Sequence, residues 1–286
     1  MSSAQSTGMK TKNISLFIKP LLFILLAACI ATAVYATASC NISVASAEVI
    51  DPEFGVPPQG IRPVTETVLQ TEFRRVLNPE EVSRVELVAF YTDKSLFARG
   101  SEIRIYSPNA KDPVLTIVSP QNAGYEPNLF FADFTGGGYE QIFYSVQSGG
   151  SGGYAFQYLF DVSNAEIKTL YDGNGLDGFK AEYADCYKVK VYNEYAQYVI
   201  DISSRPAEYL DELYSADGTL KAPRTADVWG VSYAFPTFNP AQEKYILTVF
   251  RRITGLYNAD SFGYVVDFLE YDDGAFRSYY QGVLIN

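Results

Sequence analysis

The residues of this chain that could do acid–base chemistry are carboxylates, because its 286 residues include no histidine. That absence excludes Ser-His-Asp and Cys-His mechanisms, His-ligated zinc and the usual general base at neutral pH. A hydrolase would instead need paired carboxylates, as in glycosidases. The candidate pairs are Asp133 with Glu140 and Asp260 with Asp267. Nothing in their spacing marks an acid or a nucleophile, so we predict no catalytic residues and a chain that is not an enzyme.

Four other features could bind a ligand, and each has a plainer structural interpretation. The glycine-rich segment 148–153 lacks the Gly-Lys-Ser/Thr of a phosphate-binding loop, so a hairpin loop is predicted. Residues 172–178 have acidic residues at calcium-like spacing but no terminal Glu, which favours a turn. Arg251 and Arg252 could bind an anion, although ordinary ion pairs are favoured. Trp229, the only tryptophan, is too little to define a site.

The composition favours a β protein that binds neither nucleic acid nor anionic lipid by charge. Aromatic residues make up 15% of the chain, with 23 Tyr and 19 Phe, and such side chains pack well on strands. The tyrosines could line a sugar-binding face, although a Tyr-rich sheet is the commoner case. The formal net charge is −11, and a chain this acidic is repelled by phosphate backbones. Its acidic surface suits a soluble protein outside the cell.

The first 47 residues have the pattern of a secretory signal peptide. Three lysines up to Lys19 precede the apolar run 21–35, and small residues follow it. Cleavage is predicted after Ala38 or after Ala47. The alternatives are an uncleaved membrane anchor and a lipid on Cys29, which ends a lipobox-like Leu-Ala-Ala-Cys. The predicted location is extracellular or at the cell surface, with the membrane reached only through this segment.

The cysteines and the glycosylation sequon depend on where that cleavage falls. A cut after Ala38 would leave Cys40 and Cys186 able to pair, whereas a cut after Ala47 would leave Cys186 alone. We expect Cys186 to be a buried small side chain. The sequon Asn41-Ile-Ser lies in the segment that the later cut would remove.

Residues 48–63 are predicted to be a proline-rich linker, and residues 64–286 a β-repeat domain. The linker contains four prolines, which remove backbone donors and stiffen the chain. Apolar residues at near-helical spacing predict an amphipathic helix over 64–77. A second short helix is predicted from Ser204 to Tyr214, because Pro206 suits a first turn. Strands are predicted over 86–91, 102–106, 114–118, 128–160 in three pieces, 187–192, 198–202, 245–250, 264–271 and 276–285.

A faint repeat underlies the predicted fold class. Residues 78–87, 133–142 and 238–247 each form a turn-rich segment that leads into an apolar strand, with a weaker member near Asp185. Their spacing predicts propeller-like repeats of about 50 residues, irregular or partial, in a mainly β protein with one or two short helices. The alternative is a β-sandwich.

The segment 133–142, Asp-Phe-Thr-Gly-Gly-Gly-Tyr-Glu-Gln-Ile, resembles the Asp-x-Asp-Gly-Asp-Gly-x-x-Asp-Ile loop of VCBS and FG-GAP repeats. The resemblance implies a secreted bacterial protein with β-propeller blades and calcium-binding loops. This chain departs from that pattern, because Thr135, Gly137 and Gln141 replace acidic residues. Calcium prefers six to eight oxygens, so we expect no cofactor, or weak calcium at best.

The favoured function is a non-catalytic extracytoplasmic binding or scaffold module. Its ligand would be a cell-wall polysaccharide or a protein partner at the cell surface. Two alternatives stay open: a carboxylate-based glycan hydrolase and a calcium-stabilised adhesion module. The hydrolase predicts two carboxylates in one cleft, whereas the binding module predicts a flat or concave aromatic patch.

Overall fold

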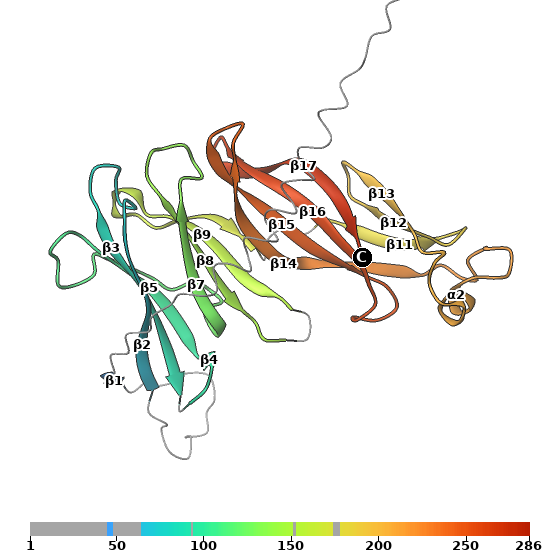
Figure 1. Cartoon of the computed structure of the whole chain (residues 1–286), viewed down its shortest axis with the longest axis horizontal. Helices are drawn as coiled ribbons and strands as arrows, with labels where there is room; N and C mark the ends of the chain where they lie inside the picture. Colours follow the sequence, from blue (N-terminus) through green and yellow to red (C-terminus); the bar gives the residue numbers. More distant parts are fainter. Residues whose placement is uncertain (1–44, 48–63, 93, 151–152, 174–177) are drawn as a thin grey trace, which may run out of the picture. The chain divides into compact units, whose positions relative to one another are not determined.

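The computed structural model describes residues 45–47, 64–92, 94–150, 153–173 and 178–286, and these residues are mainly β. Their strands form three antiparallel sheets of five, five and seven strands (Figure 1). The predicted signal peptide, apart from 45–47, and the predicted linker 48–63 lie outside the described residues. Within those residues, no helix is long and apolar enough to cross a membrane.

Each sheet is built largely from strands that follow one another in the chain. Sheet 1 contains, in spatial order, β1 (Ala45–Ala47), β2 (Val64–Arg74), β3 (Ser83–Thr92), β5 (Gly100–Tyr106) and β6 (Leu115–Ile117). Sheet 2 contains β10 (Lys168–Asp172), β9 (Ala155–Asp161), β8 (Gln141–Gln147), β7 (Gly124–Ala132) and β4 (Phe97–Ala98). Sheet 3 contains β13 (Gln197–Asp201), β12 (Lys188–Tyr192), β11 (Lys180–Ala184), β14 (Thr225–Asn239), β15 (Lys244–Thr254), β16 (Ser261–Asp272) and β17 (Ala275–Ile285).

In the described ranges, two short helices accompany the strands. The 3-10 helix η3 (Ser163–Ala165) follows β9, and the α-helix α2 (Ala207–Leu213) follows β13. The predicted helix over 204–214 is therefore confirmed, with Pro206 at its N-cap.

The helix predicted over 64–77 is wrong, because residues 64–74 form strand β2. β2 pairs with β3 along its length, and the register shifts between Val68 and Gln70. The shift leaves Leu69 as an extra residue, which breaks the period of two and mimics helical spacing. Val76 and Leu77 follow the strand and are buried in the core beneath it.

Sheets 1 and 2 pack face to face around a first core. From sheet 1, β3 contributes Val85 and Leu87, and from sheet 2, β8 contributes Tyr144 and Val146. A side-chain amide also joins the layers, because the Gln70 Oε1 atom accepts the Leu129 backbone N–H at 2.7 Å.

Sheet 2 is buried on both faces and is the middle layer of the molecule. Phe143 and Leu159, whose side chains point away from the first core, enter a second core with Leu247 and Val249 of sheet 3. Gln157 joins the same two sheets, donating to the Ala234 carbonyl at 2.8 Å and accepting its N–H at 2.6 Å. This double burial explains why β8 and β9 have apolar residues in both alternating sets.

Sheet 3 is nearly closed, because its two edge strands β13 and β17 contact each other. Its inner face holds a third core that includes Val189, Val191, Ile253 and Val265. Helix α2 packs against this core through Leu213.

The propeller prediction is wrong. The three sheets differ in strand number and share cores as stacked layers, whereas propeller blades are similar four-stranded sheets around an axis. The aligned segments 78–87, 133–142 and 238–247 fall in three different sheets and share only turn chemistry. The Asn78 Oδ1 atom accepts two loop N–H groups, and Asp133 and Asn239 cap their own turns in a related way.

Predictions about single turns and about Cys186 have different outcomes. The Asp217-Gly218 and Asp273-Gly274 turns are confirmed, with positive φ at both glycines.

Cys186 is free and exposed in the turn between β11 and β12, so its predicted burial is wrong. Its φ of 62° lies in the left-handed region that is typical of tight turns, outside the regular strand pairing. Cys40 lies outside the described residues.

Candidate functional site

The Asp133 carboxylate organises the glycine-rich loop between β7 and β8. Its Oδ1 atom accepts the backbone N–H groups of Thr135 at 3.1 Å, Gly136 at 2.7 Å and Gly137 at 3.2 Å. Its Oδ2 atom accepts the Gly138 N–H at 2.8 Å. Gly136 and Gly138 both have a φ of 77°, which explains the glycines. Four backbone donors therefore bind the Asp133 carboxylate. In a calcium-binding loop the equivalent carboxylate would bind the ion instead.

The residues that the structure describes contain no cluster suited to a metal ion. No group of three or more His, Cys, Asp or Glu residues there could hold a metal ion. Gln141 occupies a position where the calcium loop has an acidic residue. Its side chain accepts the Phe134 N–H at 2.7 Å and so joins the two ends of the loop.

Glu140 lies beside Asp133 but is bound to arginine. Its Oε2 atom accepts the Arg75 backbone N–H at 3.3 Å, and its Oε1 atom lies 3.5 Å from Arg74 Nη1. Both acids line an open depression of about 410 Å³, which Phe73 and Tyr139 also line. Asp133 and Glu140 are thus neighbours, but protein donors already bind both carboxylates.

Asp260 lies at the centre of a buried network at the end of sheet 3. Its Oδ2 atom accepts the Tyr209 hydroxyl at 2.6 Å and the Leu256 N–H at 2.9 Å. Tyr209 in turn lies 2.7 Å from the Tyr183 hydroxyl. Arg205 Nη1 forms an ion pair with Asp260 Oδ1 at 3.4 Å. Burial, reinforced by Asp260, raises the pKa of Tyr209, and burial raises that of Tyr183 to about 12. The network fastens α2 and the loop 255–260 to β11.

Asp267 is paired with Arg251 on the inner face of sheet 3. The two side chains are 95% buried or nearly so, and Arg251 Nη1 lies 3.3 Å from Asp267 Oδ2. Ser278 and Gln281 of β17 also donate to Asp267. Along this face, the pair separates the second core from the third. Asp260 and Asp267 therefore each have their own arginine, and neither shares its contacts with the other acid.

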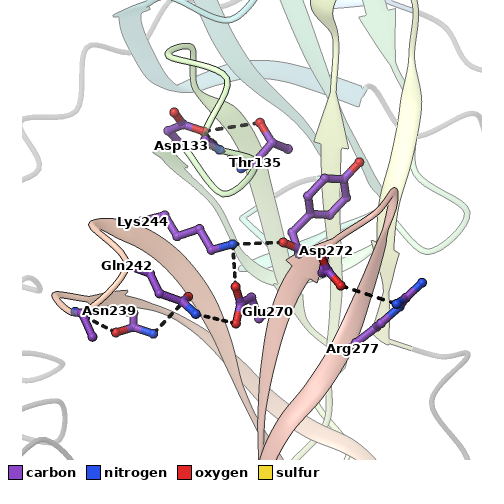
Figure 2. A network of polar contacts seen from close by, with 11 residues as sticks. Asp133, Thr135, Asn239, Gln242, Lys244, Glu270, Asp272 and Arg277 are labelled. Carbon is purple, nitrogen blue, oxygen red and sulfur yellow. Dashed lines mark hydrogen bonds and ion pairs between the residues drawn. The ribbon is translucent and has the colours of Figure 1, made fainter.

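A more exposed polar network lies at the turns of sheet 3 beside the Asp133 loop (Figure 2). Lys244 Nζ lies 2.7 Å from Glu270 Oε1, and Gln242 donates to Glu270 Oε2 at 2.8 Å. These two donors lower the pKa of Glu270. Arg277 reaches Asp272 at 3.4 Å on the neighbouring strand. The network fastens the β14–β15 turn to β16.

The outer face of sheet 3 presents aromatic rings to solvent. Strand alternation places them opposite the cores, across four neighbouring strands. None of them belongs to any of the three cores. We call this surface the aromatic face; it consists of Tyr233, Phe235, Phe250, Tyr264, Phe268 and Tyr280. Phe235 and Tyr280 are 44% and 55% exposed.

The rings of the aromatic face contact one another in a continuous row. Ring centroids are 6.0 Å apart from Tyr233 to Phe235, 5.9 Å from Phe235 to Phe250 and 6.1 Å from Phe250 to Tyr264. A second group pairs Phe268 with Tyr280 at 5.7 Å. Offset and edge-on contacts of this kind are favourable for aromatic pairs, so the face is ordered without a ligand.

Trp229 lies at one end of the aromatic face. It is 41% exposed, and its Nε1 atom donates to Thr254 Oγ1 at 2.7 Å. Its ring lies 6.3 Å from that of Tyr154 in the hairpin between β8 and β9. Sequence reasoning set this residue aside because one tryptophan is weak evidence. The useful signal was the spacing of Tyr233 and Phe235 two residues apart on β14, but only the strand pairing brings them beside Phe250 and Tyr264.

The two glycine-rich segments have the expected local roles as far as they are described. Residues 148–150 and 153 belong to a β8–β9 hairpin, in which the Ser148 N–H donates to the Tyr154 carbonyl at 2.8 Å. The hairpin prediction is confirmed. In the segment 172–178, residues 174–177 lie outside the described part, so the predicted turn stays a prediction.

The segment that contains sheet 3 is similar to a known domain. Residues 177–284 match the YybI C-terminal domain. The uncharacterized protein YybI of Bacillus subtilis (strain 168) is 32% identical over 169 residues. That similarity covers 57% of this chain and 64% of YybI, so the chain spans less than two thirds of this relative. No solved structure matches the chain.

This match corrects the resemblance to VCBS and FG-GAP repeats, which is wrong because neither family is found. The YybI-like segment begins just before β11 and ends within β17. It therefore contains the aromatic face, the Arg251–Asp267 pair and the Asp260 network, whereas the Asp133 loop lies outside it.

Proposed function

We propose that this chain is a non-catalytic binding module that holds a protein partner on the aromatic face of sheet 3. The observation that supports the proposal is the set of six rings on the outer face of sheet 3, two exposed and four half-buried, which belong to none of the three cores. Contiguous exposed apolar patches on soluble domains mark interaction surfaces. Aromatic residues and arginine are also the residues that most often dominate binding energy at protein interfaces.

Three of the six rings favour a protein over a more polar ligand. Phe235, Phe250 and Phe268 have no polar group, so an apolar surface is their best partner. Fully burying such a side chain is worth about 1.5–3 kcal/mol. Four strands at a spacing of about 4.8 Å give the face a width of roughly 15–20 Å, which suits a compact protein contact.

The arrangement of acids supports a non-catalytic function. Asp133 and Glu140 are bound by loop N–H groups and arginines, and Asp260 and Asp267 have separate arginine partners. A glycosidase needs one carboxyl group that donates a proton and another that acts on the sugar or on water. Carboxylates held this way are poorly suited to either task.

A glycan is the second candidate ligand, and the continuous ring row favours it. Rings at spacings of 5.9–6.1 Å could stack on successive sugars, and Tyr233 and Tyr264 could hydrogen-bond to sugar hydroxyls. The acidic chain would then favour a neutral polysaccharide over an anionic one.

Site-specific photo-crosslinking in the producing cells tests the proposal. A photoreactive residue would replace Phe235, and the matched control would replace Tyr195, which is 84% exposed in the β12–β13 turn. We expect a discrete, protease-sensitive adduct from position 235 and none from position 195. The adduct should disappear when Phe268→Ser is added, with the melting temperature unchanged. A protease-resistant glycan adduct would favour the second candidate, and equal adducts at both positions would overturn the docking surface.

The place of action is proposed from the N-terminal segment. Its lysines, apolar run and small residues support export from the cytoplasm. Intact-mass measurement of the protein from its native cells should give a chain that starts at Ser39 or Glu48. A full-length, unmodified N-terminus in the cytoplasmic fraction would contradict export, and a lipid on Cys29 would identify the anchored form.

A further inference from the structure

Arg252 is a cationic residue at the end of the aromatic face that lies near Trp229. It lies on the outer side of β15 between Phe250 and Thr254, and its register partner on β16 is Tyr264. Thr254 is covered by Trp229. A ligand on the rings would therefore also meet this guanidinium.

The Arg252 guanidinium has no carboxylate partner among the residues that the structure describes. Its Nη2 atom donates to the Asn258 carbonyl at 2.8 Å and to the Asn258 side chain. Its Nε atom is buried and makes no hydrogen bond there. The chain has 33 acidic and 22 basic residues, and Arg251 next door has its own Asp267. Arg252 therefore lacks an ion-pair partner among the described residues, although acidic residues outnumber basic ones in the chain.

A second polar group beside Arg252 also lacks a partner. The Tyr154 hydroxyl is buried and makes no hydrogen bond within the described part of the chain. Its ring contacts Trp229, and the nearby Arg252 charge partly offsets the rise that burial causes in the pKa of Tyr154. Near Trp229, the described residues thus leave two buried donors, Arg252 Nε and the Tyr154 hydroxyl, without a hydrogen bond.

We propose that Arg252 binds a carboxylate of the partner while the neighbouring rings take the apolar group beside it. The partner would present an Asp, a Glu or a chain terminus next to an apolar or aromatic side chain. Asn258 holds the guanidinium in place for this contact, which it would make through its terminal nitrogens. Charge-assisted hydrogen bonds of this type are about twice as strong as neutral ones. This inference rests on the proposed function of the aromatic face.

Trp229 makes the test direct, because it is the only tryptophan in the chain and lies at this site. Its fluorescence would be excited at the red edge of tryptophan absorption, where Phe and Tyr do not absorb. The probes are N-acetylphenylalanine, which carries a carboxylate, and its neutral amide. In the full chain we expect the carboxylate to bind about tenfold more tightly than the amide, which corresponds to about 1.4 kcal/mol. The preference should shrink in high salt.

Variants separate this inference from the proposed function. Arg252→Gln should remove the preference for the carboxylate and leave the affinity for the amide unchanged. Arg277→Gln makes the same change in charge at an exposed position of β17 and should keep the preference. Phe250→Ala should weaken both probes, as the proposed function requires.

Two results would overturn the assignment of Arg252. One is equal binding of the two probes to the unsubstituted chain, and the other is an equal loss of preference in Arg252→Gln and Arg277→Gln. In either case, a loss of both probes in Phe250→Ala would still support docking on the rings. Retention of both probes in Phe250→Ala would count against the aromatic face itself.

Discussion

Arg251 and Arg252 show how one step along a strand changes the role of a side chain. Successive residues of β15 point to opposite faces of the sheet, so Arg251 enters the interior and Arg252 faces the aromatic side. Inside, Arg251 meets Asp267, and both side chains are buried between two apolar cores. Desolvating two charges is costly, so such a pair tolerates the loss of one member poorly.

Removing only the acid of this pair should therefore be strongly destabilising. Asp267→Asn keeps the shape but leaves the Arg251 charge buried without its counter-ion. We expect the free energy of unfolding to fall by about 3–5 kcal/mol, measured by urea denaturation. The double variant Arg251→Met/Asp267→Leu should recover most of that loss.

The exposed pair Lys188–Asp201 provides the matched control. Asp201→Asn makes the same chemical change on the surface and should alter the unfolding free energy by less than about 1 kcal/mol. If Asp267→Asn behaved like this control, the buried pair would not have the energetic role assigned to it.

At the scale of elements, the loop from Asp133 to Gly138 is a turn built around one carboxylate. Asp133→Ala would leave four loop N–H groups without their acceptor, and we expect a loss of about 1–3 kcal/mol. Asp133→Asn, which keeps one carbonyl oxygen, should lose less. Excess calcium should leave the melting temperature of the unsubstituted chain unchanged, since the carboxylate is already occupied. A rise of several degrees would restore the calcium-stabilised adhesion module as a candidate.

The Lys244–Glu270 pair should contribute to the acid sensitivity of sheet 3. The pKa of Glu270 is lowered in the folded chain, so its contribution is present above the ordinary carboxyl pKa and is lost as the pH falls through the lowered value. Glu270→Gln should reduce stability at pH 7 by less than about 1 kcal/mol and flatten the decline of the melting temperature below pH 5. Asp272→Asn, in a more exposed pair, should leave that decline as it is.

Sequence reasoning located most strands but not the way in which they combine. The alternation over 142–147 and 155–160 correctly predicted β8 and β9, because a period of two depends on local geometry alone. The bulge at Leu69 hid β2, since one extra residue shifts the pattern. The repeat was inferred from Asn78, Asp133 and Phe238, where side-chain capping of turns creates similar sequences in unrelated places.

The candidate site was harder to predict for a related reason. Tyr233, Phe250 and Phe268 are far apart in the chain and meet only through strand register. The four acids were weighed as candidates and no catalytic role was predicted for them, and the arginine partners that three of them have depend on tertiary contacts. No spacing rule distinguishes Asp267, which is buried, from an exposed aspartate such as Asp201.

At the scale of the whole molecule, sheet 2 lies between two cores, so the YybI-like segment is not independent of the rest. A fragment of residues 178–286 keeps the third core but exposes Val231, Leu247, Val249 and Leu269, which sheet 2 normally covers. We expect the fragment to fold and to self-associate more strongly than the full chain at equal concentration, measured by analytical ultracentrifugation. Leu247→Lys/Leu269→Lys in the fragment should suppress the association, and a fragment as monomeric as the full chain would argue against the shared core.

The middle position of sheet 2 also sets the order in which the molecule can be completed. When β10 has left the ribosome, the first core has all its strands, but the side of sheet 2 that carries Phe143, Leu159 and Tyr171 is still bare. The strands that cover it end roughly 100 residues later, which is about 5–20 s of synthesis at 5–20 residues per second. During that interval the nascent chain exposes an apolar surface, to which a neighbouring nascent chain can bind. We therefore expect the yield of folded protein to depend on how long this side of sheet 2 stays uncovered.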